Sequence, residues 1–267
     1  MGSDQIGGRF YPPKPKDVYF FATCLIDQFV PEAGLDAVRL LEREGINVHY
    51  LEQQTCCGQP AYSSGFPDEA RAVALQQLNL FTKHWPVVIP SGSCGGMICK
   101  HYPSLFADDP KLHSKALELA SRVYELTEFL VHIVNFKQQD LGPHCTVALH
   151  TSCHARREMG AHETSIALLE SLNNVNIVQQ DRIEECCGFG GTFAIRYPEI
   201  SEAIVTDKVA SIKASGANQV ISADCGCLLN ISGRAAKQDE MAGRTAPSLK
   251  GEHIATFLWK RTSQEII

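Results

Sequence analysis

The sequence lacks the features that mark several broad classes of protein. No stretch approaches the roughly 18 uninterrupted apolar residues that a membrane-spanning helix needs. The N-terminus has no charged segment followed by an apolar run, so we expect no secretory signal. Lysine and arginine (24) are fewer than aspartate and glutamate (30), and no basic stripe is present, which argues against a nucleic-acid partner. These absences predict a soluble protein of the cytoplasm.

Three familiar cysteine and glycine patterns are also missing. The eleven cysteines are an odd number and too sparse for a disulfide scaffold, so in a reducing compartment they indicate metal binding or catalysis. The cysteines that recur in the chain include no closely spaced C-x₂₋₄-C pair of the kind that holds a structural zinc ion. Gly188-Phe-Gly190-Gly191 lacks the G-x-G-x-x-G spacing of a dinucleotide site, so nothing predicts NAD or flavin binding.

What the sequence does contain is an internal repeat of about 130 residues. Four cysteines recur at spacings of 129 to 131 residues, as the pairs Cys24/Cys153, Cys56/Cys186, Cys57/Cys187 and Cys94/Cys225. A period this long indicates two duplicated domains, because the repeats of a solenoid are only a few tens of residues long. We therefore expect a flexible leader over residues 1–16, a first domain over 17–136 and a second domain over 144–262.

Each copy is predicted to be an α/β domain built on a parallel sheet, with a pseudo-twofold axis relating the two. Short apolar strands alternate with helical patterns, over 18–22, 31–44, 46–51, 67–83 and 87–90 in the first copy and 146–150, 162–172, 175–178, 198–214 and 220–222 in the second. Residues 103–136 are predicted to be mainly helical, 233–250 a loop and 253–261 a last helix. Cysteines follow the carboxyl ends of the strands, so a parallel sheet brings those of each copy to one rim.

Four thiolates that converge from three loops suit an iron–sulfur cluster or a zinc ion, and they disfavour Mg²⁺ and Ca²⁺. Ligands from widely separated loops favour the larger cluster, with zinc as the alternative. Glycines beside the vicinal cysteines let backbone N–H groups approach the sulfurs, a role predicted for Gly58, Gly188, Gly190 and Gly191. Direct thiol–disulfide exchange by the vicinal cysteines is a third interpretation.

The other candidate residues are predicted to be structural. The cysteines outside the repeat pattern are read as small buried apolar residues: Cys99, Cys145 and Cys227. His150 and His154 flank Cys153, and we expect packed histidines there, with metal ligation or proton transfer as the alternative. Arg156-Arg157 is read as a solvated helix start, with carboxylate binding as the alternative.

Four local sequences carry a resemblance to a known family. They are Phe21-Ala-Thr-Cys24-Leu-Ile-Asp, Gln54-Thr-Cys56-Cys57-Gly58-Gln-Pro60, Ser91-Gly-Ser-Cys94-Gly-Gly-Met97 and Glu185-Cys186-Cys187-Gly188-Phe-Gly-Gly-Thr192. Over about residues 17–262 the chain resembles the cysteine-rich CCG domains of heterodisulfide reductase, of the glycolate oxidase iron–sulfur subunit and, above all, of the lactate-utilisation protein A family of iron–sulfur oxidoreductases.

This resemblance implies an electron-transfer role in oxidising L-lactate to pyruvate, with a 4Fe-4S cluster in each domain. It also implies a ferredoxin-like iron–sulfur subunit and a third small subunit as partners. Met97 and Leu228 stand where the heterodisulfide reductase version has a further cysteine, so we do not expect its five-thiolate noncubane cluster or its disulfide chemistry. No hydride acceptor is evident, so we expect activity only with partner subunits. The alternatives are a zinc-stabilised non-redox subunit of the same complex and a thiol–disulfide oxidoreductase resembling heterodisulfide reductase.

Overall fold

The computed structural model describes residues 9 and 11–264 and contains two four-stranded parallel sheets of the same topology. The first has the strand order β2-β1-β3-β4, with β1 (Asp17–Phe20), β2 (Asn47–Tyr50), β3 (Val87–Ile89) and β4 (Val123–Glu125). The second has the order β6-β5-β7-β8, with β5 (Cys145–Leu149), β6 (Val175–Val178), β7 (Gln219–Ser222) and β8 (Lys250–His253). The predicted α/β class with two homologous parallel-sheet domains is confirmed.

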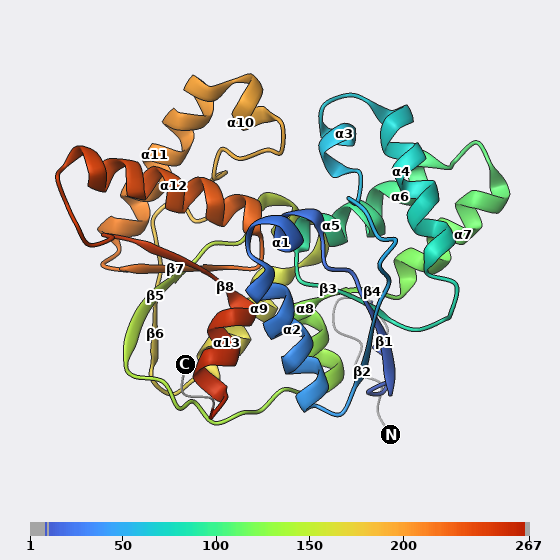
Figure 1. Cartoon of the computed structure of the whole chain (residues 1–267), viewed down its shortest axis with the longest axis horizontal. Helices are drawn as coiled ribbons and strands as arrows, with labels where there is room; N and C mark the ends of the chain where they lie inside the picture. Colours follow the sequence, from blue (N-terminus) through green and yellow to red (C-terminus); the bar gives the residue numbers. More distant parts are fainter. Residues whose placement is uncertain (1–8, 10, 265–267) are drawn as a thin grey trace.

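The helices form a central layer between the sheets and a layer on each outer side (Figure 1). The central helices are α2 (Pro31–Arg43), α8 (Leu126–Phe129), α9 (Ala161–Glu170) and α13 (Ile254–Thr262). The outer helices are α4 (Pro67–Leu80), α6 (Tyr102–Leu105) and α7 (Pro110–Ser121) beside the first sheet and α11 (Pro198–Ala214) and α12 (Cys225–Met241) beside the second. Shorter segments are α1 (Cys24–Phe29), α3 (Gln59–Ser63), α5 (Gly92–Gly96), α10 (Phe193–Arg196) and the π-helical turns η1 (Met97–His101), η2 (Leu130–Val134) and η3 (Ala155–Met159).

One apolar core joins the two copies. Phe20 of the first sheet, Leu149 of the second and Leu130 and Phe257 from the central layer belong to the same cluster of buried side chains. Helix α2 of the first copy packs on α13 of the second, and the equivalent pair with the copies exchanged, α9 and α8, packs in the same way. Each large apolar side chain that is fully buried stabilises the fold by about 1.5–3 kcal/mol before entropy is counted. The two repeats therefore fold against each other through a shared interior.

The edge strands β4 and β8 are the elements that the sequence prediction missed. Strand β4 lies in a segment predicted to be helical, and β8 replaces the end of a predicted loop and the start of the last helix. Neither is an apolar run, and Lys250 and Gly251 are exposed. Their last residues are polar because they cap the next helix: Glu125 accepts a hydrogen bond from Thr127 N, and His253 Nδ1 accepts one from Ala255 N. The predicted loop at 233–250 is also wrong over its first part, where α12 continues to Met241.

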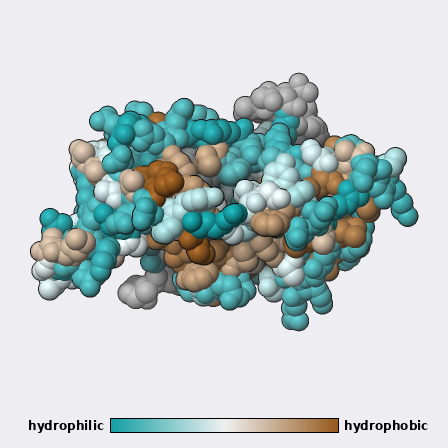
Figure 2. All heavy atoms as spheres, turned by 90° about the horizontal axis from the view of Figure 1, so that it is seen from above, coloured by the Kyte–Doolittle hydropathy of each residue, from teal (hydrophilic) through white to brown (hydrophobic). Residues whose placement is uncertain are grey.

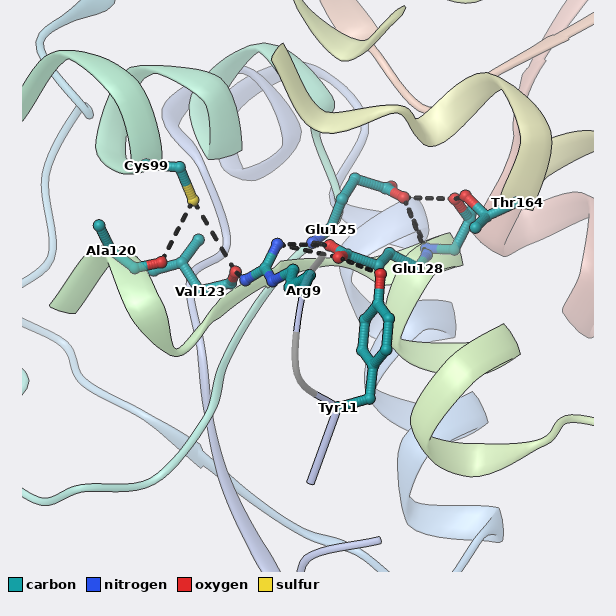
Figure 3. Close-up of polar contacts among 9 residues, drawn as sticks. Arg9, Tyr11, Cys99, Ala120, Val123, Glu125, Glu128 and Thr164 are labelled. Carbon is teal, nitrogen blue, oxygen red and sulfur yellow. Dashed lines mark hydrogen bonds and ion pairs between the residues drawn. The ribbon is translucent and has the colours of Figure 1, made fainter. Parts of the chain in front are cut away.

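The start of the described chain lies against the first domain. Residues 1–8 and 10 of the predicted flexible leader are outside the described residues. Arg9 forms an ion pair of 2.8 Å with Glu128, and the Tyr11 hydroxyl donates a hydrogen bond to the same carboxylate (Figure 3). Tyr11 also stacks on His132, with ring centroids 4.5 Å apart. Among the described residues, no helix combines the length and apolar character that crossing a membrane requires.

Candidate functional site

The cysteines of both copies meet at the carboxyl ends of the central strands. In each sheet the chain order reverses between two adjacent strands, β1 and β3 in the first and β5 and β7 in the second. Cys24 follows β1 and Cys153 follows β5, while Cys94 and Cys227 are the third residues of the helices after β3 and β7. Ligands of open parallel sheets bind at such reversal points. The topology therefore places the thiols where this class of fold binds its ligands.

Both sets of thiols line one cavity of about 460 Å³. Nine cysteines contribute to its wall: Cys24, Cys56, Cys57, Cys94, Cys153, Cys186, Cys187, Cys225 and Cys227. All eleven cysteines of the chain are free thiols. The rest of the wall is mostly apolar or small, with Pro60 from the first copy and Phe189 from the second. The two copies therefore share a single thiol-rich chamber.

In the first copy, the vicinal cysteine loop and the helix after β3 hold four thiols together. Cys57 Sγ lies 3.4 Å from Cys94 Sγ, and both residues are buried. Cys56 Sγ accepts a hydrogen bond from the backbone N–H of Gly58, which lies 3.4 Å away. The neighbouring Cys24 thiol above all, together with this N–H, lowers the pKa of Cys56 to about 3. Gly58 has a φ of +87°, the left-handed conformation that glycine adopts without strain.

The second copy repeats this arrangement. Cys187 Sγ lies 3.0 Å from Cys227 Sγ, and both residues are buried. The Gly188 N–H lies 3.3 Å from Cys186 Sγ and donates to it. The neighbouring Cys153 thiol is the largest cause of the pKa of Cys186 being lowered to about 2. Each copy thus has one thiolate stabilised by a neighbouring thiol and a glycine N–H. That Gly58 and Gly188 support a bound cluster stays a prediction.

The backbone pairing shows which cysteine is equivalent to Cys94. Val88 in β3 and Ile221 in β7 accept equivalent backbone hydrogen bonds, of 3.0 and 2.8 Å, from the residue that follows β1 or β5. Six residues beyond Val88 is Cys94, and six residues beyond Ile221 is Cys227. The sequence comparison instead matched Cys94 with Cys225, which is two residues earlier. The structure therefore brings Cys227, and not Cys225, into sulfur contact with the vicinal pair of the second copy.

Cys225 takes a different position at the boundary between the copies. It is the first residue of α12 and packs with Ile26 and Ala33 of the first copy, and this burial raises the pKa of its thiol. Its role as a metal ligand stays a prediction. One signal in the sequence favours Cys227: a residue type that caps helices, Ser91 or Asp224, stands three positions before the contacting cysteine in each copy.

Asp224 links the cysteine-bearing turns of the two copies. Its side chain is buried and crosses to the first copy, where one carboxylate oxygen accepts hydrogen bonds of 3.0 Å from Ser91 Oγ and from Ser93 N. The other oxygen accepts a hydrogen bond of 2.6 Å from Ser152 Oγ, next to Cys153. The carboxylate therefore caps α5 from across the boundary. These bonds fix the relative position of the two thiol sets.

His150 lies beside the buried thiols of the second copy. Its ligand atoms and those of Cys187 and Cys227 are all within 4.8 Å of one another, an arrangement that suits a metal ion. The side chain is 1% exposed, neither ring nitrogen has a nitrogen or oxygen partner among the described residues, and the ring interacts with the thiol of Cys227. His154 also lines the cavity, with Nδ1 at 3.5 Å from Cys153 Sγ, but it is partly exposed.

Of the remaining residues considered in the sequence analysis, two glycines line the cavity and the others lie outside its wall. Gly190 and Gly191 line the wall, but no hydrogen bond from their N–H groups to a sulfur is found among the described residues, so that role stays a prediction. Cys99 and Cys145 are outside the wall, and burial raises the pKa of Cys99 to about 12. Arg156 is also outside the wall.

Exposed apolar side chains surround the mouth of the cavity. Phe29 from α1 is 62% exposed and Ile195 from α10 is 82% exposed, and both line the cavity together with Leu229 from α12. Figure 2 shows apolar surface near the middle of the face that bears α3 and α10. Exposed apolar groups that cluster at a cavity are typical of interaction surfaces.

Comparison with known proteins agrees with the repeat and with the fold. The family model described as a cysteine-rich domain, CCG, matches residues 18–99 and 147–232. Lactate utilization protein A of Shouchella clausii is 44% identical over 91% of this chain and 98% of its own length. The protein of that name in Bacillus subtilis is 41% identical over 91% of this chain and 99% of its own.

A crystal structure of a hypothetical protein from Helicobacter pylori has the same fold, with a TM-score of 0.68 and 12% identity. The likeness covers 96% of this chain and 51% of that one. The sequence matches are more specific than the shared fold, because the two ranges that match the family model contain both vicinal cysteine pairs. The chain therefore belongs to the lactate utilization protein A family and carries two CCG cysteine-rich domains.

Proposed function

We propose that this protein is an iron–sulfur electron-transfer subunit of a complex that oxidises L-lactate to pyruvate. The observation that carries the proposal is the convergence of two thiol sets on one cavity. We assign one cluster to each copy, held by Cys24, Cys56, Cys57 and Cys94 in the first and by Cys153, Cys186, Cys187 and Cys227 in the second. The names of the relatives support lactate as the substrate, and the arrangement of the cysteines supports iron–sulfur chemistry.

The donor set fits iron–sulfur clusters well. Thiolates are the usual ligands of such clusters, and a 4Fe-4S cluster takes four of them. When bound, a cluster accepts and releases single electrons. The Gly58 and Gly188 N–H groups reduce the negative charge on Cys56 and Cys186, which stabilises the thiolates. The eleven free thiols also suit a reducing compartment such as the cytoplasm.

The same cavity is poorly suited to lactate itself. The residues that line it include no lysine or arginine. Recognition of a carboxylate normally uses such cations, and arginine in particular binds it with two parallel hydrogen bonds. Asp224, the carboxylate in the wall, would repel the substrate. We infer that lactate loses its two electrons and two protons on a partner subunit and that this protein receives the electrons.

The mouth of the cavity is the proposed contact with the partners, a ferredoxin-like iron–sulfur subunit and a third small subunit. Phe29 and Ile195 expose apolar surface beside the thiols, which favours binding of a protein at this position. A partner seated there also shields the chamber from water.

The test is anaerobic purification followed by stepwise reduction. We expect iron in the protein and visible absorption that dithionite bleaches. Lactate should bleach it only when the partner subunits are present. Stoichiometric zinc without iron would instead indicate a structural module of the same complex. Activity that survives removal of iron but is lost on alkylation of the thiols would indicate a thiol–disulfide enzyme.

A further inference from the structure

The two cysteine sites differ at one equivalent buried position. Phe21 and His150 each directly follow the first strand of their copy and donate equivalent backbone hydrogen bonds across to the third, of 3.0 and 2.8 Å. Each stands three residues before the first cysteine of its set. Phe21 is 0% exposed and lies in the outer apolar core of the first copy, in contact with Phe81. The second copy has an imidazole at the position where the first copy has a hydrocarbon ring.

This imidazole is buried without the hydrogen bonds that a core histidine normally makes. Leaving a buried polar group without a partner costs about 1–3 kcal/mol. No nitrogen or oxygen atom of the described residues is a partner of either ring nitrogen of His150, and the polar group that interacts with the ring is the thiol of Cys227. By contrast, the buried His253 places Nε2 3.0 Å from Pro90 O and accepts at Nδ1 from Ala255 N. His150 therefore has the environment of a side chain whose partner is a bound group.

The groups nearest to His150 indicate what that partner is. Cys187 and Cys227 are both buried, and the ligand atoms of the three residues lie within 4.8 Å of one another. Thiolates together with an imidazole nitrogen are a donor set suited to iron and zinc. No described residue offers the first copy an equivalent nitrogen, because the matching side chain is phenylalanine.

We propose that an imidazole nitrogen of His150 binds the metal centre of the second copy, which makes the two centres of the protein chemically different. This inference rests on the proposed iron–sulfur function, and in it His150 replaces one of the four thiolates assigned to the second copy, a substitution that the repeat pattern of cysteines does not contain. The second centre then has mixed nitrogen and sulfur ligation, and the first has thiolates alone.

The difference in ligands between the two centres determines which of them is reduced first. A neutral imidazole donates less negative charge than a thiolate, so a cluster with histidine ligation is easier to reduce than one with thiolates alone. At equilibrium, a single electron in the protein should therefore reside on the second centre.

Nitrogen ligation is tested directly by pulsed EPR on the reduced protein, purified anaerobically from cells fed ¹⁵N-histidine. We expect a strong coupling to ¹⁵N in the wild type, which His150→Phe abolishes and His154→Phe retains. In His150→Phe, which gives the second copy the residue of the first, one midpoint potential should fall or one centre should be lost, while the other centre is unchanged. His150→Cys should restore a lost centre with a lower potential and no ¹⁵N coupling.

Other outcomes would overturn the inference. These are a protein with iron but without ¹⁵N coupling, a coupling that His154→Phe removes, or identical spectra and potentials in His150→Phe and wild type. A protein that contains no iron after anaerobic purification and reconstitution would contradict the proposed function itself, so the two failures are distinguishable. Phe21→His provides the reciprocal variant, in which we expect the potential of the first centre to rise.

Discussion

Replacing Glu125 with glutamine should change how the stability of the protein depends on pH. Glu125 ends β4, caps α8 and is completely buried, and its Oε2 accepts a hydrogen bond of 2.7 Å from Thr127 N. Thr127 Oγ1 in turn lies 2.7 Å from Thr164 Oγ1 of α9, so the group sits where the two copies meet (Figure 3). The other carboxylate oxygen has no partner among the described residues.

The size of the effect follows from the burial of this carboxyl group. Burial raises the pKa of Glu125 from 4.5 to about 8, and the charges of Asp224 and Glu128 contribute in the same direction. In the unfolded chain the group releases its proton near pH 4.5, whereas the folded protein keeps it up to about pH 8. The folded state binds more protons in this window, so stability falls as pH rises, by about 5 kcal/mol at most over the whole window. Glutamine remains neutral and retains an acceptor oxygen for the cap.

The assay is urea unfolding of anaerobic protein at two pH values. Between pH 6 and pH 8.5, we expect wild type to lose about 3 kcal/mol more stability than Glu125→Gln. The variant should be the more stable protein at pH 8.5. Glu163→Gln, an exposed position on α9, is the matched control and should follow wild type. If Glu125→Gln and wild type had parallel pH profiles, the assignment of a neutral buried Glu125 would be refuted.

Three further substitutions test the site and its surroundings. Asp224→Ala removes three hydrogen bonds, two of them across the boundary between the copies, and should cost on the order of 3 kcal/mol in urea unfolding. A cost below about 1 kcal/mol would contradict its linking role. Gly188→Ala should destabilise the fold more than Gly58→Ala. Both glycines have a positive φ, but an added Cβ would lie 2.7 Å from a backbone oxygen at Gly188 and 3.3 Å from one at Gly58. The midpoints of urea unfolding compare the two variants. Ile195→Glu should slow reduction by the partner subunits without loss of iron, whereas Met241→Glu, also exposed, should not; equal rates in stopped-flow measurements would exclude the mouth as the contact surface.

The fold was largely predictable because its signals are local. Apolar strands such as 87–90 alternate with helices that begin at a proline, and the 130-residue repeat implies two copies of one unit. The strands β4 and β8 were missed because an edge strand of three or four residues needs no apolar run. Their polar ends, Glu125 and His253, serve as helix caps and hide the strand pattern. The sequence also gives no direct indication that both copies share one core and one cavity.

The residue types of the site could be predicted from the sequence. Which cysteine of the second copy is equivalent to Cys94 was harder to predict. The vicinal cysteines and the glycines beside them lie together, because both loops follow strands of a parallel sheet. The Cys-Gly-Cys sequence at 225–227 offers two thiols, and spacing alone matched Cys225 with Cys94. The strand pairing shows that Cys227 has the equivalent place, and in the sequence only the helix-capping residue three positions earlier favours it. The sequence predicts a packed histidine at His150, because its contact with the buried thiols and its lack of nitrogen or oxygen partners are visible only in three dimensions.

The most direct test of the central claim is the iron and acid-labile sulfide content of protein purified and reconstituted without oxygen. We expect eight irons and eight sulfides per chain on the basis of two 4Fe-4S clusters, about half of each in Cys57→Ser and in Cys187→Ser, and the full amount in Cys145→Ser, whose thiol lies outside the cavity. Full iron content in both Cys57→Ser and Cys187→Ser, or a wild-type protein that binds zinc and no iron, would contradict two iron–sulfur centres in the shared cavity.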